Sequence, residues 1–380
     1  RRLKQRVAGT TAGDIINPAR TSPSQSSQIC GQCHSHMANH DGDQDGARQF
    51  LKTGLHYRPG DDLHAFGKLL TLKDGHRGNE FRFWADGNCR SGGREYNGLL
   101  GSPCHQPPGV GENQSRQMSC LSCHSMHNAP ANDQLKPIAT RNPACTQCHP
   151  RFQDTATLKA HTHHQANSTG SQCYNCHMPH TSYALFKAIR SHQIDSPRVT
   201  PTGPNTRPNA CNLCHLDRTL TWTSDHLADW YGQPRVELTG ADRDISAAVH
   251  WALAGDAGQR VIAAWHFGWE PAQTASGTPW IAPALAQTLK DPYPAIRWVG
   301  WQSLKSLPGM PAFDYDFDGP DAHRRNVVEQ LTRGRRHDPM PTNDRPARPE
   351  IFIRSGGHSD WKSMERLIRA RDNRRVEIYE

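Results

Sequence analysis

One arrangement of cysteine and histidine occurs five times in this chain of 380 residues. In each copy two cysteines stand three positions apart, and a histidine directly follows the second cysteine. The copies are Cys30-Cys33-His34, Cys120-Cys123-His124, Cys145-Cys148-His149, Cys173-Cys176-His177 and Cys211-Cys214-His215. Residues three and four positions apart share one face of a helical turn, so both thiols can reach the vinyl groups of one porphyrin while the imidazole reaches its iron. The pattern C-x-x-C-H therefore predicts covalently attached c-type haem, one per motif.

A single CxxC pair is also compatible with half of a zinc site, with a redox dithiol or with a disulfide. Zinc sites need a partner pair at a regular interval and do not require a histidine after each pair. In this chain the histidine follows all five pairs. The repetition therefore favours haem over the other interpretations.

Two further cysteines leave a sixth attachment site open. Cys89 and Cys104 are separated by fourteen residues, and His105 directly follows the second of them. In the haem interpretation a loop replaces the usual spacer of two residues. In the alternative interpretation the two thiols form a disulfide, which would stabilise the fold by about 3 kcal/mol for a loop of this size. The histidine favours haem narrowly, because a disulfide does not require it.

The remaining histidines can supply the second axial ligand of each iron. The 23 histidines of the chain, less the five in the motifs, leave 18. Histidine at both axial positions gives iron suited to electron transfer, and a histidine that faces away from its own haem can bind a neighbouring iron. The expected distal ligands are His127, His180, His192 and His164, followed by His161 and His40. Weaker candidates for the first haem are His36, His56, His64 and His76. Histidines that we expect to be structural are His250, His266, His323, His337 and His358.

Composition agrees with a chain that encloses large cofactors. Apolar residues, counted with glycine and without tyrosine, make up about 41% of the sequence, below the usual range of about 45–50%, and we expect the macrocycles to fill the interior instead. The net charge is +8. The C-terminal arginines are interleaved with acidic residues, so we expect them to neutralise haem propionates or to lie in solvent rather than to bind nucleic acid.

The cysteine chemistry also predicts a cellular location. In c-type cytochromes covalent haem attachment is completed outside the cytoplasm, so the chain is expected in the periplasm or outside the cell. No apolar run reaches the length of about 18 residues that a spanning helix needs, so no membrane span is expected. The sequence starts at Arg1 without the apolar stretch of a signal peptide, which fits a processed or truncated chain.

The chain divides into three predicted segments. Residues 1–233 contain every cysteine and are rich in Gly, Pro, Asn and His, which predicts a multihaem cytochrome c domain with little regular structure. Residues 234–312 have helical periodicity. Residues 313–380 are expected to form a basic wrapping tail with one helix near Trp361 to Arg371. The predicted fold class is thus mainly α with extensive loop.

The middle segment is expected to form two helix pairs. The predicted helices are Ile245 to Leu253, Arg260 to Trp265, Ile281 to Lys290 and Ala295 to Leu307. An Asp-Pro turn at Asp291 separates the last two, as in HEAT repeats, whose paired helices bury their apolar faces on neighbouring pairs. Because fewer than three such units are visible, we expect this HEAT-like module to depend on the haem-binding segment for its stability.

Several longer strings resemble one family of proteins. They are Gly93-Arg94-Glu95-Tyr96-Asn97-Gly98-Leu99, Ser119 to His127, Cys173 to His180, and Asn209 to His215 ahead of Trp230-Tyr231-Gly232. These strings resemble bacterial multihaem c-type cytochromes with doubled CxxCH motifs, related to the cytochrome c554 group and often ending in HEAT or tetratricopeptide repeats. Members usually carry further motifs upstream of the segment from Ile16, which this chain lacks. Relatives often have an aromatic residue at the position of His105, and this difference favours a sixth haem.

Three functions agree with these patterns. The leading hypothesis is a non-catalytic electron carrier with a chain of bis-histidine haems, whose partners are redox proteins or extracellular acceptors. A refinement is a homopolymer, a conductive filament in which haems continue across head-to-tail contacts. The alternative is an oxidoreductase acting on small nitrogen or sulfur compounds at one haem with an open axial position, so enzymatic activity is left open.

Overall fold

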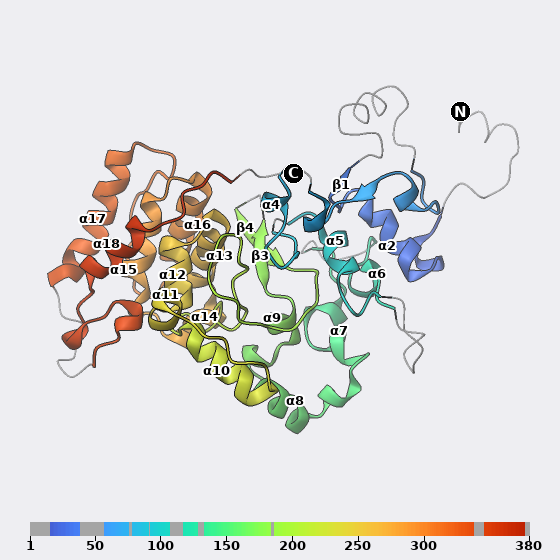
Figure 1. Ribbon diagram of the computed structural model, residues 1–380, viewed down its shortest axis with the longest axis horizontal. Helices are drawn as coiled ribbons and strands as arrows, with labels where there is room; N and C mark the ends of the chain where they lie inside the picture. Colours follow the sequence, from blue (N-terminus) through green and yellow to red (C-terminus); the bar gives the residue numbers. More distant parts are fainter. Residues whose placement is uncertain are drawn as a thin grey trace, which may run out of the picture. The chain divides into compact units, whose positions relative to one another are not determined.

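The computed structural model describes residues 16–38, 57–75, 78–90, 92–106, 117–127, 133–183, 186–337 and 346–376. His40, His56 and His76 lie outside these ranges. The described chain is mainly helical, with few and short strands, in agreement with the predicted class (Figure 1). Within the described residues, no helix combines the length and the apolar character that crossing a membrane requires.

Contacts divide the chain into two compact units that do not follow chain order. The first unit contains Arg1–Thr71, Gly93–Ala166 and His192–Ile194. The second contains Leu72–Gly92, Asn167–Ser191 and Asp195–Glu380. The segment boundaries after residues 233 and 312 stay predictions.

The first unit consists of short helices and turns. Its helices are α2 (Pro23–Gly31), α5 (Glu95–Leu100), α6 (Cys120–Cys123), α7 (Pro143–Thr146) and α8 (Thr155–Thr162). Its 3-10 turns are η1 (Pro18–Arg20), η2 (Leu63–Ala65), η4 (Pro137–Thr140) and η5 (Pro150–Gln153), and its strands are β1 (Met37–Ala38) and β2 (Lys68–Leu69), which pair antiparallel. A small buried apolar cluster contains Tyr57, Leu63 and Tyr96. Among the described residues of this unit, conventional core is therefore scarce, whereas the second unit has a large apolar core that the composition does not lead one to expect.

The second unit combines one hairpin with many helices. The hairpin pairs β3 (His180–Tyr183) with β4 (Lys187–Arg190), and His180 stands opposite Arg190. The shorter elements are η3 (Leu72–Asp74), α4 (Asn79–Arg82), η6 (Thr169–Ser171), α9 (Cys173–His177), α11 (Gly240–Asp244), η7 (Gln287–Lys290), η8 (Pro349–Ile351) and η9 (Ser355–Gly357). The longer helices are α10 (Leu220–Tyr231), α12 (Ala247–Ala254), α13 (Ala257–Phe267), α14 (Glu270–Ser276), α15 (Ile281–Ala286), α16 (Pro294–Lys305), α17 (Asp321–His337) and α18 (Trp361–Arg369).

Four of these helices contribute much of the apolar core of the second unit. Helix α13 packs against α12 and α16, and α15 packs against α16 (Figure 1). Asp256 starts α13 with a capping box to Gln259, and Pro294 occupies the first turn of α16, both typical starts of a helix. The periodicity that predicts helices in this segment is therefore confirmed, with a 3-10 turn in place of the last part of the helix expected to reach Lys290.

The C-terminal region contains more helix than expected. Besides α18, which matches the helix predicted near Trp361, the structure forms the long helix α17. Val327 and Val328 of α17 are buried, and α17 contacts α15 and η7. Charged residues dominate its sequence, so the apolar signal is confined to one narrow face. The expectation of a tail with a single helix is wrong for this reason.

A buried ion pair joins distant parts of the second unit. Arg260 on α13 donates to Asp291 at 2.7 Å, and their side chains are 0% and 2% exposed. Arg260 also donates to the carbonyl oxygens of Gly255 and Asp372, each at 2.6 Å. The backbone N–H of Asp372 donates to Ala254. The chain near residue 372 is thereby tied to the loop between α12 and α13.

Candidate haem-binding site

All five motifs fold as one turn of helix. In four of them the histidine N–H donates to the carbonyl of the first cysteine, at 2.8 to 3.0 Å, and these bonds are His34 to Cys30, His124 to Cys120, His149 to Cys145 and His215 to Cys211. The remaining motif, the fourth, forms the helix α9. The two cysteines and the histidine of each motif therefore occupy positions that share one helical face. This is the local geometry that attachment of one macrocycle requires.

Local sequence explains why these turns form. Ser22 caps α2, which carries Cys30, and Pro23 follows in its first turn. Ser119 forms a capping box with Ser122 around the second motif. In the fifth motif the Asn209 side chain accepts from the N–H of Cys211 at 2.8 Å. Each of these groups satisfies a backbone donor that a helix start leaves open.

Within the first unit, thiols from different motifs lie close together. The Cys120 thiol donates to the Cys30 sulfur, and this hydrogen bond lowers the pKa of Cys30 to about 7. Burial raises the pKa of the Cys104 thiol, and the nearby Cys148 thiol raises this pKa further. The first motif thus neighbours the second motif. Cys104, a cysteine of the candidate sixth site, neighbours the third motif.

The second unit has a similar grouping. Burial raises the pKa of Cys176 to about 11 and that of Cys214 to about 12, and Cys176 contributes electrostatically to the shifts at both Cys211 and Cys214. The fourth and fifth motifs are therefore neighbours. Such surroundings penalise a thiolate but not a thioether, because a thioether carries no charge. The donor set fits covalent attachment.

The ring orientation of the motif histidines also fits iron ligation. His124 and His177 donate from Nδ1 to the carbonyl oxygens of Asp133, at 2.9 Å, and Asp195, at 2.7 Å. A carbonyl only accepts, so the proton is on Nδ1 and the lone pair is on Nε2. Neutral histidine with this second partner is the usual form of a metal ligand.

His34 differs because its partner is a carboxylate. Its Nδ1 lies 2.8 Å from Glu95 Oε2 on α5. Burial opposes ionisation of Glu95, but hydrogen bonds from His34 and from the backbone N–H groups of Glu95 and Gly93 lower the pKa of Glu95 to about 2. A charged partner makes the imidazole a stronger electron donor. The first haem site is therefore built differently from those of His124 and His177.

The surroundings of His105 resemble those of the motif histidines. Its Nδ1 donates to the carbonyl of Met118 at 2.6 Å, and the residue is 4% exposed. The N–H of Met118 in turn donates to the carbonyl of Cys104 at 2.8 Å. Cys89 belongs to the second unit and Cys104 to the first. The choice between a sixth haem and a disulfide stays a prediction.

One predicted distal ligand of the first unit, His192, lies beside a motif histidine. Its ring stacks on that of His124, with centroids 6.2 Å apart and planes 22° apart. Its carbonyl accepts from Ser102 Oγ at 2.8 Å. Gly98 permits this approach, because a Cβ there would lie 2.7 Å from the backbone nitrogen of Gln193. His192 is thereby brought to the second motif.

The other predicted distal ligands have varied surroundings. His164 donates from Nδ1 to the carbonyl of Thr162 at 2.6 Å, and the His161 ring lies 4.7 Å from that of Phe152. His127 is exposed, and His180 packs against aromatic residues of α13. None of the predicted distal ligations is tested by these contacts, so each stays a prediction.

Sequence reasoning missed His226. It lies on α10 and donates from Nδ1 to the carbonyl of Trp222 at 2.7 Å. Its ring lies between those of Trp222 and Trp230, at 4.2 and 4.7 Å, and Trp222 lies 5.0 Å from the His215 ring of the fifth motif. The spacing of four residues between Trp222, His226 and Trp230 was the available signal, because such residues share a helical face.

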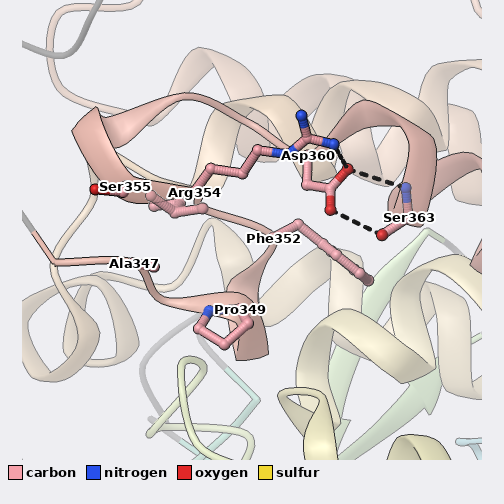
Figure 2. A pocket seen from close by; sticks show the side chains of 8 residues that line it. Ala347, Pro349, Phe352, Arg354, Ser355, Asp360 and Ser363 are labelled. Carbon is pink, nitrogen blue, oxygen red and sulfur yellow. Dashed lines mark hydrogen bonds and ion pairs between the residues drawn. The ribbon is translucent and has the colours of Figure 1, made fainter.

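A separate pocket lies in the C-terminal region. It has a volume of about 300 Å³, and its lining includes Phe352, Arg354, Asp360 and Ser363 (Figure 2). Asp360 accepts from Arg354 at 2.6 Å and from Ser363 Oγ at 2.8 Å. No residue that lines this pocket belongs to a CxxCH motif. It has no part in the candidate site.

Comparison with known proteins supports the cysteine chemistry. Residues 113–154 match the family model of the doubled CXXCH motif, and this range contains the second and third motifs. No curated protein and no solved structure matches the chain. The match supports a haem-binding region of the c-type cytochrome kind, and the motifs imply haem c as the cofactor.

Proposed function

We propose that this protein is a multihaem c-type cytochrome that transfers electrons in the periplasm or outside the cell. The observation that carries the proposal is the repetition of one C-x-x-C-H helical turn five times in the described chain. When bound, haem c supplies one-electron oxidation and reduction of its iron. The chain supplies attachment, axial ligands and spacing.

The grouping of the thiols supports transfer between neighbouring sites. Cys30 lies beside Cys120 in the first unit, and Cys176 lies beside Cys211 in the second. Cofactors attached at neighbouring thiols would themselves be neighbours. The hydrogen bond from His105 supports its role as a haem ligand, and the sequence pattern alone extends this sixth site to Cys89 and Cys104.

The finer parts of the proposal rest on sequence patterns. The predicted distal ligands would give irons with two histidines, and the helices α12 to α16 would form the HEAT-like module. A homopolymer remains a refinement of the electron-transfer function. An oxidoreductase would instead need one iron whose second axial position is open to substrate, and the spectrum described next separates the two.

Haem content is the first test. We expect the matured protein to exceed the mass of its polypeptide by five or six haem masses, because each motif holds one haem. Intact-mass spectrometry and haem quantitation measure this number, and electron paramagnetic resonance of the oxidised protein should show low-spin iron throughout. Four haems or fewer would refute the assignment. A stoichiometric high-spin signal would favour the oxidoreductase.

The sixth site has its own test. We expect tryptic digestion to release Cys89 and Cys104 on peptides joined through one haem, which absorb in the Soret region and resist reduction by a thiol. A disulfide would instead give colourless peptides that separate on reduction. In a matched variant, Cys104→Ser, the haem count should fall by one. An unchanged count together with colourless peptides would leave a protein of five haems.

A further inference from the structure

In the second unit, the His180 side chain contacts a second histidine, His266. His180 begins β3, and its Nδ1 lies 3.2 Å from Nε2 of His266, a residue of α13 that is 1% exposed. His266 has a second contact, from its own Nδ1 to the carbonyl of Ile262 at 2.8 Å. We propose that His266 is a positioning residue, which fixes His180 in the tautomer and orientation of an iron ligand. This inference rests on the proposed function.

The carbonyl oxygen of Ile262 determines the direction of the two hydrogen bonds made by His266. The Ile262 carbonyl only accepts, so His266 carries its proton on Nδ1 and its lone pair on Nε2. His266 Nε2 must then accept, so His180 donates from Nδ1. The lone pair of His180 is therefore on Nε2, the nitrogen that remains for the metal. The backbone of α13 thus determines which nitrogen of His180 can coordinate.

This argument requires both rings to be neutral. His266 is 1% exposed, and Arg190 stands opposite His180 in the register of the β3–β4 hairpin. The Arg190 guanidinium is fixed nearby by the carbonyls of Tyr174 and Met178 and by the side chain of Asn175. A second cation beside it would be costly. The two histidines therefore stay uncharged donors and acceptors.

Aromatic packing holds the pair in place. The rings of Trp265 and Trp269 lie 4.5 and 5.1 Å from the His180 ring. The backbone of His180 is set by the β3–β4 hairpin, and α13 contacts both strands. A ligand held on two sides loses little further freedom on coordination. The alternative is that His266 merely fills the core, and this predicts that any side chain of similar size would serve.

The test compares acceptors at position 266 in the full-length, haem-loaded protein. His266→Gln keeps an oxygen that can accept from His180, whereas His266→Leu removes it and His266→Met leaves only a weak thioether acceptor. Without the acceptor, His180 donates less electron density to iron. We expect one haem of the Leu and Met variants to shift to a more positive midpoint potential in a spectroelectrochemical titration, and the Gln variant to stay close to wild type.

Controls separate this effect from packing. His323→Leu on α17 removes another histidine of the same unit and should shift no potential. In a His180→Ala background the effect of His266→Leu should disappear. Equal shifts in the Leu, Met and Gln variants, or no shift in any of them, would overturn the proposal. A wild-type protein without haem would instead refute the proposed function itself.

A measurement on the wild type avoids the risk that the substituted proteins do not mature. Proton nuclear magnetic resonance of the oxidised protein detects the paramagnetically shifted Nδ1 protons of axial histidines. The proposal requires one such proton to exchange slowly in D2O, because it lies between His180 and buried His266, and to be absent from His180→Ala. If every shifted Nδ1 proton exchanges rapidly, His266 does not hold His180.

Discussion

Replacing His180 with alanine should convert one haem from low spin to high spin while every haem stays attached. His180 follows His177 by three residues, so we expect it to face a neighbouring iron rather than the iron of its own motif. Its removal leaves an iron with a single protein ligand, since alanine offers no donor atom. Electron paramagnetic resonance and the optical spectrum of the oxidised protein report the spin state, and mass spectrometry reports the haem count.

His127→Ala should have the same consequence at another iron, because His127 follows His124 at the same distance. His323→Ala is the matched control, since His323 lies on α17 and accepts from the N–H of Asp316. Its spectrum should equal that of the unmodified protein. If His127→Ala and His180→Ala both retain an all-low-spin spectrum, the distal ligands lie elsewhere, and His226 becomes the first residue to substitute.

Replacing Arg260 with methionine should destabilise the second unit by about 3–5 kcal/mol. The change leaves the Asp291 carboxylate buried without its main partner, and it keeps only the more distant Arg371, at 3.5 Å, and the N–H of Tyr293, at 2.9 Å, among the described contacts. The carbonyls of Gly255 and Asp372 lose a donor as well. Denaturant unfolding followed by far-UV circular dichroism measures the loss of helix.

A surface pair provides the control for this substitution. Arg243 and Asp244 lie 2.7 Å apart, and their side chains are 59% and 55% exposed. Arg243→Met should leave the free energy of unfolding nearly unchanged, since exposed pairs contribute little. The double variant Arg260→Met with Asp291→Leu should be more stable than Arg260→Met alone, because no unpaired charge stays buried. Equal losses for Arg260→Met and Arg243→Met would contradict the buried-pair account.

The sequence pattern predicted those helices and turns whose formation depends on residues close together in the chain. The C-x-x-C-H spacing predicts the helical turns at Cys30 and Cys211, and periodicity predicts α12 and α13. The proximity of Cys30 to Cys120 could not be predicted, because it is a long-range contact between segments that are far apart in the sequence. Helix α17 was missed since its charged face hides a narrow apolar one.

The role of His266 shows a different limit. On a helix rich in apolar residues, a single histidine suggests a buried structural side chain, and the structure confirms that it is buried. Its relation to His180 arises only when β3 packs against α13. Periodicity identifies which face of a helix is buried, but it does not identify the polar atom of a distant segment that contacts a side chain on that face. Sites assembled from two distant segments therefore need the fold as well as the motif.

The hydrogen bond from Arg260 to the carbonyl of Asp372 sets an order of events during synthesis. A ribosome makes residue 372 after every CxxCH motif, so the buried charge of Arg260 cannot gain its full set of acceptors until nearly the whole chain has been made. The motifs emerge while α12 and α13 still lack this closing segment. The second unit is thus expected to acquire its final stability only when the segment around residue 372 reaches Arg260.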